Sequence, residues 1–291
     1  MMRGTERNPP WSRAYSQTIV DGMATYTEWN PAEAAGCIAV PGEHDDKYSR
    51  GVLGVITGSD QYPGAAVLGV EAALHTGLGM VRYVGHERAA DFVLARRPEV
   101  VVGAGRVQAW LIGSGTDYKN YTSADAEDAV AEGLPTVLDA GALALHARHT
   151  GPLVVTPHFR ELSRLIGVDA DEIAADPARW AQEASERLGA TVLLKGHSSY
   201  VAGGGELLRV RSAPTWLATA GAGDALAGIL GALVATHVDE INADDRMLPR
   251  LAATASVLHG LAAARAGAGG PFTILGLIEA LPATIAGLLR P

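Results

Sequence analysis

Cysteine and long hydrophobic runs are scarce in this sequence of 291 residues. Cys37 is the single cysteine, so an intramolecular disulfide and an all-cysteine metal cage are both excluded. The longest uncharged apolar run, residues 225–236, is too short to cross a bilayer. The first sixteen residues are polar and lack the apolar core of a secretory signal peptide. We therefore expect a cytoplasmic protein that does not associate with membranes.

Basic residues are also few, because 23 Lys and Arg stand against 32 Asp and Glu, for a net charge of −9. Binding to nucleic acid needs a basic footprint, so we expect no nucleic-acid partner. Four motifs are absent as well: the Walker phosphate loop, the dinucleotide fingerprint after a strand, paired-histidine zinc spacing and the hydrolase nucleophile elbow. An acidic chain can still bind a nucleotide, because one local anion site is enough.

Short apolar, β-rich runs alternate with helical patterns along most of the chain. This alternation predicts a three-layer α/β/α fold, with helices on both faces of a mostly parallel sheet. We expect residues 46–291 to form this domain and residues 1–45 to form an arm that is packed on it or partly disordered. Predicted strands cover residues 52–57, 80–84, 109–112, 136–138, 153–155, 192–194, 200–202 and 207–210, and predicted helices cover residues 65–75, 89–96, 124–131, 160–166, 177–188, 224–236, 248–264 and 274–289.

The strongest functional signal is a turn of small residues, Thr-Ala-Gly-Ala-Gly-Asp at positions 219–224, which opens an apolar helix. Free amides and a partial positive charge at a helix start form an anion hole suited to phosphate. We assign that hole to Gly221, Ala222 and Gly223. Asp224 is a candidate general base for an incoming hydroxyl, and the alternative is a carboxylate that only interacts favourably with the helix dipole.

A second signal is the segment Lys195, Gly196, His197, Ser198 and Ser199, which directly follows an apolar strand. The chain has three lysines in all, and Lys195 is the one at the end of a core strand. Its ammonium can contact a phosphate as a point charge. The alternative is a lysine whose stem covers the core while its charge reaches solvent.

Further polar residues lie where other predicted strands end. His158 is a candidate substrate contact or, alternatively, a structural hydrogen-bonding group. Glu161 either caps the following helix or holds a metal-bound water. Asp139 is a candidate polar contact for substrate or metal. The loop at residues 58–66 either lies over a substrate or is an ordinary strand-to-helix connection.

Six short motifs follow one another in an order that is more specific than any motif alone. They are Lys47-Tyr48-Ser49-Arg50-Gly51, Tyr62-Pro63-Gly64-Ala65-Ala66, Gly77-Leu78-Gly79-Met80-Val81, Leu138-Asp139-Ala140-Gly141-Ala142-Leu143, Thr156-Pro157-His158 and Lys195-Gly196. Together they resemble the ribokinase-like superfamily and, more closely, the ADP-dependent NAD(P)H-hydrate dehydratase family, from about Lys47 to Leu289. Two departures occur: Phe159-Arg160 replaces the family's Pro-Gly, and Ala222 replaces its threonine.

The resemblance implies ADP-dependent dehydration of the S-epimer of NAD(P)H hydrate back to NAD(P)H. It implies ADP or ATP as phosphoryl donor, Mg²⁺, a homo-tetramer, and an NAD(P)H-hydrate epimerase encoded separately. The implied roles are catalysis for Asp224, contact with the hydrate for Ala65, Gly115, His158 and Asp224, and nucleotide binding for Lys195, Gly196, His197, Ser198, Ser199 and Gly223.

Two other functions stay open from the sequence. The first is a small-molecule kinase of the hydroxymethylpyrimidine or sugar type, which would use the same anion hole and Asp224 but release a stable phosphorylated product. The second is a non-catalytic nucleotide-binding relative, for which Phe159-Arg160 and Ala222 would be the signs of a lost active site.

Overall fold

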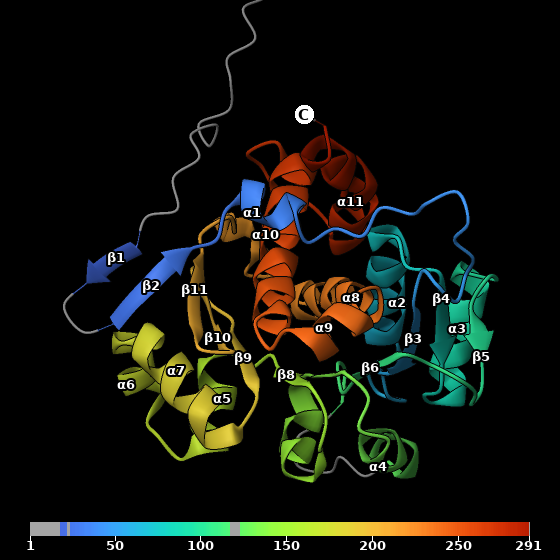
Figure 1. Ribbon diagram of the computed structural model, residues 1–291. Helices are drawn as coiled ribbons and strands as arrows, with labels where there is room; N and C mark the ends of the chain where they lie inside the picture. The colour runs from blue at the N-terminus through green and yellow to red at the C-terminus, as the bar shows by residue number, and fades with distance from the viewer. Residues whose placement is uncertain (1–17, 22–23, 117–122, 291) are drawn as a thin grey trace, which may run out of the picture.

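A single sheet of 11 strands organises the computed structural model, which describes residues 18–21, 24–116 and 123–290. The strand order is β1-β2-β11-β10-β9-β8-β7-β6-β3-β4-β5 (Figure 1). All neighbours from β9 to β5 run parallel, as the alternation of strands and helices predicts. The strands are β1 (Thr18–Asp21), β2 (Ala24–Glu28), β3 (Val52–Ile56), β4 (Met80–Tyr83), β5 (Val101–Val102), β6 (Ala109–Ile112), β7 (Thr136–Leu138), β8 (Leu153–Val155), β9 (Thr191–Leu194), β10 (Ser199–Gly203) and β11 (Glu206–Val210).

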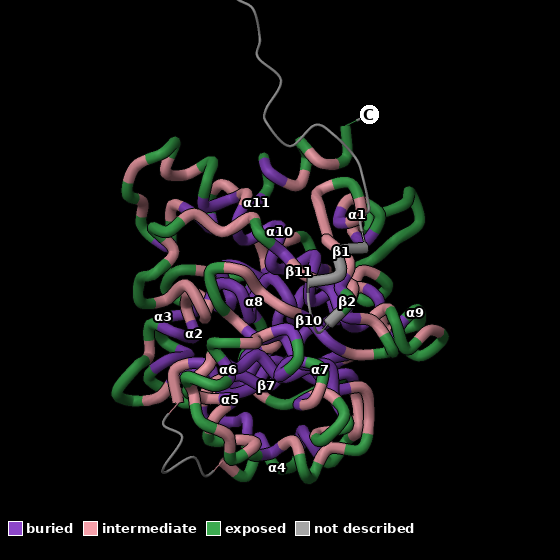
Figure 2. Tube along the Cα trace, turned by 90° about the vertical axis from the view of Figure 1, so that its left-hand side faces the viewer, coloured by how far each residue is buried: buried purple, intermediate pink, exposed green. Residues whose placement is uncertain are grey.

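The two faces of the sheet each bury a separate apolar core. On β3, Leu53 and Val55 point into one core, while Val52 and Ile56 point into the other. Side chains alternate between the faces of a strand, so a strand covered on both sides is a continuous apolar run. Figure 2 shows the buried residues gathered along the centre of the molecule, with exposed residues in the peripheral loops.

Helices cover both faces, as the three-layer prediction requires (Figure 1). Every residue of α8 from Ala225 to Ala235 is buried, which explains its apolar character on all sides. The first face carries α1 (Pro31–Ala35), α2 (Pro63–Thr76), α3 (Glu87–Arg96), α8 (Ala222–Ala235), α9 (Val238–Ala243), α10 (Met247–Gly267) and α11 (Ile274–Leu288), and the second carries α4 (Ala124–Ala131), the 3-10 helix η1 (Ala140–Arg148), α5 (Phe159–Ile166), α6 (Ala170–Ala175) and α7 (Pro177–Leu188). Among the described residues, no helix is long and apolar enough to cross a membrane.

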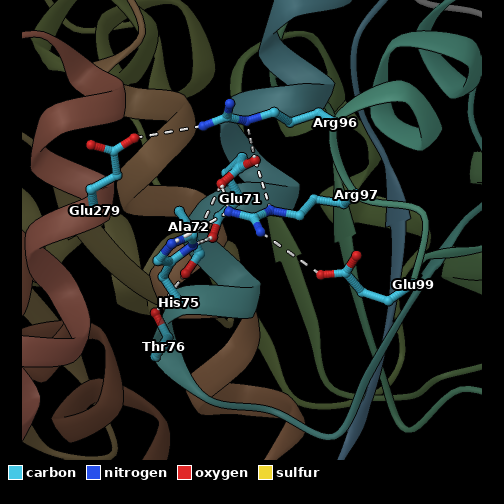
Figure 3. Close-up of polar contacts among 8 residues, drawn as sticks. All are labelled: Glu71, Ala72, His75, Thr76, Arg96, Arg97, Glu99 and Glu279. Atoms are coloured by element: carbon cyan, nitrogen blue, oxygen red, sulfur yellow. Dashed lines mark hydrogen bonds and ion pairs between the residues drawn. The ribbon is translucent and has the colours of Figure 1, made fainter.

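A buried carboxylate fixes α2 to its neighbours (Figure 3). Glu71 on α2 is 1% exposed and accepts hydrogen bonds from Arg97 at 2.7 and 2.8 Å and from Arg96 at 2.8 Å. Arg96 also lies 3.6 Å from Glu279 on α11. Burial alone would raise the pKa of Glu71, but the two guanidinium groups hold it below its ordinary value. This cluster joins α2, α3 and α11, and α2 carries Ala65 in its first turn.

Part of the expected N-terminal arm extends the sheet. Strand β2 pairs in parallel with β11, and Glu28 accepts a hydrogen bond of 2.6 Å from Arg209 Nε. The Arg209 guanidinium also lies 4.3 Å from the centre of the Tyr26 ring. Strands β1 and β2 and helix α1 were not predicted from the sequence pattern. Residues 1–17 and 22–23 of the arm lie outside the described residues.

Candidate active site

Four strand ends bring the polar candidates together at one edge of the sheet. Asp139 follows β7, His158 follows β8, Lys195 follows β9, and Ser114 lies two residues beyond β6. Carboxyl ends of parallel strands meet at one edge, where ligands bind in such sheets. His158 and Lys195 form a parallel bridge beyond the named strands. These polar residues, which the sequence places where predicted strands end, therefore lie at one edge of the sheet.

A buried ion pair forms the centre of this edge. Lys195 Nζ donates to Asp139 Oδ1 at 2.7 Å, Thr156 Oγ1 donates to the same oxygen at 2.7 Å, and Ser114 Oγ donates to Oδ2 at 2.9 Å. Burial would raise the pKa of Asp139, but Lys195 and the two hydroxyls hold it below its ordinary value. Burial would lower the pKa of Lys195, but Asp139 and Glu161 raise it instead. Both groups are therefore charged, and Lys195 does not extend freely into solvent.

The start of α8 lies beside this pair. Gly221 caps the helix with φ +88°, in the left-handed region that favours glycine. A Cβ atom on Gly223 would lie 3.7 Å from Lys195 Nζ, which places the backbone of Gly223 next to the ammonium. The start of the helix and a cation therefore lie at the same point, as an anion hole requires. Of the three amides assigned to this hole, that of Ala222 donates to the carbonyl oxygen of Thr219 at 3.4 Å. Ala222 is the first residue of the helix.

Asp224 lies in the first turn of α8 and has the most unusual carboxyl at this edge. Its pKa is raised to about 6: burial and then the charge of Asp139 raise the pKa, while the charge of Lys195 opposes the rise. Lys195 in turn responds to the charge of Asp224. A carboxylate whose pKa lies near neutrality accepts a proton more readily than an ordinary aspartate does.

His158 and Glu161 cap α5 reciprocally. His158 Nδ1 accepts the backbone N–H groups of Arg160 at 3.1 Å and Glu161 at 3.3 Å, and Glu161 Oε2 accepts that of His158 at 2.8 Å. The capping alternative for Glu161 is therefore confirmed. With Nδ1 accepting, Nε2 carries the proton of the neutral ring, and burial lowers the pKa of His158. The side chain is 47% exposed, and its Nε2 lies 3.6 Å from Glu161 Oε1.

A pocket of about 790 Å³ opens beside the start of α8. Its polar end is lined by Lys195, Gly196, His197, Ser199, Ala222 and Gly223, with His158 at the same end, while Ser198 and Gly221 adjoin lining residues in sequence. Its apolar part is lined by Val210, Ala213, Pro214, Leu217 and Leu226. This size and this mixture of surfaces are typical of small-ligand sites.

Sequence reasoning missed two walls of this pocket. One is the segment after β11, which includes the 3-10 helix η2 (Thr215–Leu217), and the other is the pair Ser256 and His259 on α10. Residues 213–218 are mostly small or apolar and carry no motif. His259 is a single histidine in an apolar helical pattern, and only the packing of α10 against α8 shows that it lines the pocket.

Ala65 and Gly115 lie against each other, away from this pocket. A Cβ atom on Gly115, where φ is +72°, would lie 2.3 Å from Ala65 Cβ, so only glycine permits the contact. The same position lies 3.2 Å from Gly58 Cα and from the carbonyl oxygen of Tyr62. Gly58 and Tyr62 line a second pocket of about 610 Å³, so the loop at residues 58–62 forms one of its walls. Ser114 connects this region to Asp139.

Comparisons with known proteins agree with one another. A family model described as NAD(P)H-hydrate dehydratase matches residues 53–273. The bifunctional NAD(P)H-hydrate repair enzyme Nnr of Mycobacterium leprae is 41% identical over 217 residues, which are 70% of this chain and 45% of that protein. The chain thus spans less than half the length of that relative. The ADP-dependent (S)-NAD(P)H-hydrate dehydratase of Xanthomonas campestris is 33% identical over 228 residues, which cover 70% of this chain and 79% of that protein.

Solved structures show the same fold. The ADP/ATP-dependent NAD(P)H-hydrate dehydratase of Bacillus subtilis, co-crystallised with ATP and Mg²⁺, superposes with a TM-score of 0.80 at 25% identity and covers 90% of this chain and 98% of its own. A ribokinase-like superfamily protein of Enterococcus faecalis superposes with a TM-score of 0.78 at 22% identity and covers 91% of this chain and 96% of its own. The ribokinase-like fold expected from the sequence is confirmed. With the family model matching most of its length, the chain belongs to the NAD(P)H-hydrate dehydratase family.

Proposed function

We propose that this chain is a hydro-lyase that uses ADP to dehydrate the S-epimer of NAD(P)H hydrate back to NAD(P)H. Family membership supports the reaction class. The observation that carries the proposal is the placement of Asp224, a carboxylate with a pKa of about 6 in the first turn of a buried helix, beside Lys195. A base and an anion hole at one point are what transfer of a phosphoryl group to a hydroxyl needs.

The proposed reaction begins at the hydroxyl on C6 of the hydrated nicotinamide ring. Asp224 removes its proton, and the oxygen attacks the terminal phosphate of ADP, releasing AMP. The amides of Gly221 to Gly223, together with Lys195, stabilise the charge that develops on the phosphoryl oxygens. The lone pair of the ring nitrogen then expels phosphate from C6, and loss of a proton from C5 restores NAD(P)H. Positioning and electrostatics come from the protein, while the electrons for elimination come from the substrate.

The remaining residues divide between the two ligands in this proposal. The nucleotide phosphates lie at the polar end of the 790 Å³ pocket, against Lys195, Gly196, His197, Ser198, Ser199 and Gly223. The hydrate approaches Asp224 from the side of Ala65, Gly115 and His158. Support comes from the contact between Gly115 and Ala65 and from the partly exposed side chain of His158.

Mg²⁺ accompanies the nucleotide in this proposal. The described residues contain no group of three or more His, Cys, Asp or Glu placed to hold a metal ion. Such a donor set fits Mg²⁺ held mainly by phosphate oxygens and water, with one or two carboxylates. Bound Mg²⁺ would neutralise part of the phosphate charge.

We further propose that the enzyme is a cytoplasmic homo-tetramer in which residues 46–291 form the catalytic domain and residues 1–45 the arm. It would receive the S-epimer from an NAD(P)H-hydrate epimerase. The bifunctional names of the mycobacterial relatives support a link between two repair activities. Mass measurement in solution tests the tetramer.

Product analysis tests the reaction. The chain is incubated with NADHX, Mg²⁺ and either ADP or ATP, and the return of the reduced-nicotinamide absorbance is followed. We expect NADH and stoichiometric inorganic phosphate. A phosphorylated product that persists would favour the small-molecule kinase instead, and the absence of NADH with both nucleotides would reject the dehydratase.

The general base is tested by Asp224→Asn, which we expect to lower turnover by about 10²-fold or more and to keep nucleotide affinity. The matched control is Asp171→Asn, because Asp171 also lies in the first turn of a helix but is exposed. Equal turnover in the Asp224 variant and the wild type would show that Asp224 is not the general base and interacts only with the helix dipole.

A further inference from the structure

A second cavity lies at the same edge of the sheet as the reaction centre, and the proposed function leaves it without a ligand. It has a volume of about 610 Å³, and its walls follow β3 and β4 and include the start of α4. The strand order β7-β6-β3-β4 continues from Asp139 after β7 to the loop at residues 58–62 after β3 and residues 84–86 after β4. Three steps of about 4.8 Å separate β7 from β4, so this edge continues for about 14 Å beyond Asp139. A ligand longer than one ring can therefore reach from the reaction centre into the cavity.

The wall formed by residues 58–62 is fixed to the position proposed for the hydrate. Ser59 Oγ donates to the carbonyl oxygen of Gly115 at 2.9 Å and accepts the backbone N–H of Tyr62 at 3.1 Å. The carbonyl oxygen of Tyr62 in turn accepts the N–H of Ala65 at 3.3 Å, in the first turn of α2. Gly115 and Ala65 lie on the side from which the hydrate approaches the general base in the proposed reaction. The cavity and the hydrate position therefore share one wall.

The polar groups of the cavity suit a nucleoside better than a phosphate. The described lining residues include Asp60, Gln61, His86 and Asp125, and they include neither lysine nor arginine. Phosphates are usually bound by cations or by free amides, and acidic side chains repel them. Carboxylate and amide oxygens accept hydrogen bonds from the hydroxyl and amino groups of a nucleoside, as the acidic residue of a dinucleotide site does from a ribose.

Tyr62 supplies an aromatic surface at this cavity. It is one of the lining residues and is 52% exposed. The hydrogen bonds to Ser59 and Ala65 fix its backbone, and Pro63, which follows it, begins α2 with a restricted backbone. A base that stacks on an aromatic ring buries apolar surface on both partners. Tyr62 is therefore the lining residue best suited to contact a base.

We infer that this cavity binds the adenosine half of the NAD(P)H hydrate and that the ring of Tyr62 stacks on the adenine base. The inference rests on the proposed function, because it takes the hydrate as the substrate and the 790 Å³ pocket as the site of ADP. With that pocket filled by ADP, a dinucleotide substrate needs a separate place for its second nucleoside. Residues 58–62 then form a substrate-binding loop and not only a strand-to-helix connection.

Titration calorimetry on the full-length chain tests this assignment with two hydrates. One is NADHX, and the other is the hydrate of reduced nicotinamide mononucleotide, which has the same ring, ribose and first phosphate but no adenosine. Both titrations contain saturating α,β-methylene-ADP, which fills the nucleotide pocket and cannot transfer its terminal phosphoryl group. The variants are Tyr62→Ala and Tyr62→Phe, which keeps the ring. The matched control is Tyr48→Ala, because Tyr48 is 50% exposed but is not among the described lining residues of either pocket.

For Tyr62→Ala we expect the affinity for NADHX to fall at least about fivefold, the low end of base stacking on an aromatic side chain, and the affinity for the mononucleotide hydrate to change less than about twofold. Tyr62→Phe and Tyr48→Ala should bind both hydrates as the wild type does. Equal losses for the two hydrates, or an unchanged affinity for NADHX in Tyr62→Ala, would overturn this inference alone. A wild-type chain that bound neither hydrate would reject the proposed function together with it.

Discussion

Acidification should switch off turnover at a pH set by one carboxylate. With its pKa raised to about 6, Asp224 is ionised in about nine-tenths of the molecules at pH 7 and in about one-tenth at pH 5. If only the ionised form accepts the hydroxyl proton, kcat falls about tenfold between these two values. An aspartate with the ordinary pKa of about 3.9 would lose less than about a tenth of its activity over the same interval.

The assay is the initial rate of NADH formation from saturating NADHX and ADP, measured at intervals from pH 4.5 to 9. Nucleotide phosphates also titrate in this range, so Asp139→Asn serves as the control. The charge of Asp139 raises the pKa of Asp224, and its removal should move the acidic limb to lower pH. The pKa values of the nucleotide phosphates in solution would be the same for the variant and the wild type, so an acidic limb caused by the nucleotide would not shift. An acidic limb near pH 4 in the wild type, or a limb that stays in place in the variant, would refute the assignment of Asp224 as the base.

Three further predictions concern stability. Because the pKa of Asp224 is higher in the folded chain than in the unfolded chain, its ionisation destabilises the fold, and this loss develops between the ordinary pKa of about 3.9 and the folded value of about 6. Asp224→Asn should therefore raise the unfolding free energy at pH 8 by about 1–2 kcal/mol but not at pH 4, as checked by thermal melts. Lys195→Met leaves Asp139 buried without its cation, so this variant should lose about 3–5 kcal/mol of unfolding free energy in urea and should bind ADP more weakly. Adding Asp139→Asn to Lys195→Met should restore the stability but not the ADP affinity. Glu71→Gln should lower the unfolding free energy by about 2 kcal/mol without changing the affinity for ADP. A lower ADP affinity in calorimetry would contradict a purely structural role for Glu71.

Much of the fold follows from local patterns in the sequence. The predicted bounds of α4, α7, β7 and β8 are those of the structure, because each of these elements begins and ends at strong local signals. Helix α7, for example, is bounded by Pro177 at its start and Gly189 after its end. Helix α8 was expected from Asp224 but begins at Ala222, since Gly221 in the left-handed region already caps it.

The elements that were not predicted depend on distant partners or are too short to show a period. Strand β2 joins the main sheet only through β11, far along the chain, and its other neighbour is β1, which was not predicted either. Helix α6 has six residues, and η1 is a 3-10 helix, so neither repeats with the α-helical period. The strand-end candidates could be predicted because parallel strands converge, whereas His259 reaches the pocket through helix packing that no local pattern encodes.

The pairing of β2 with β11 has a consequence for how the chain folds. Glu28 and Arg209 are separated by 181 positions, so forming this contact closes a very long loop. The entropy lost on closing the loop is offset only by a short ladder between β2 and β11. Contacts of high sequence separation form slowly, so we expect this margin of the sheet to join last. The ladder between β2 and β11 has two registered pairs, so it opens at a lower free-energy cost than the central strands do. Amide exchange should therefore be fastest at β2 and slowest in the central parallel strands.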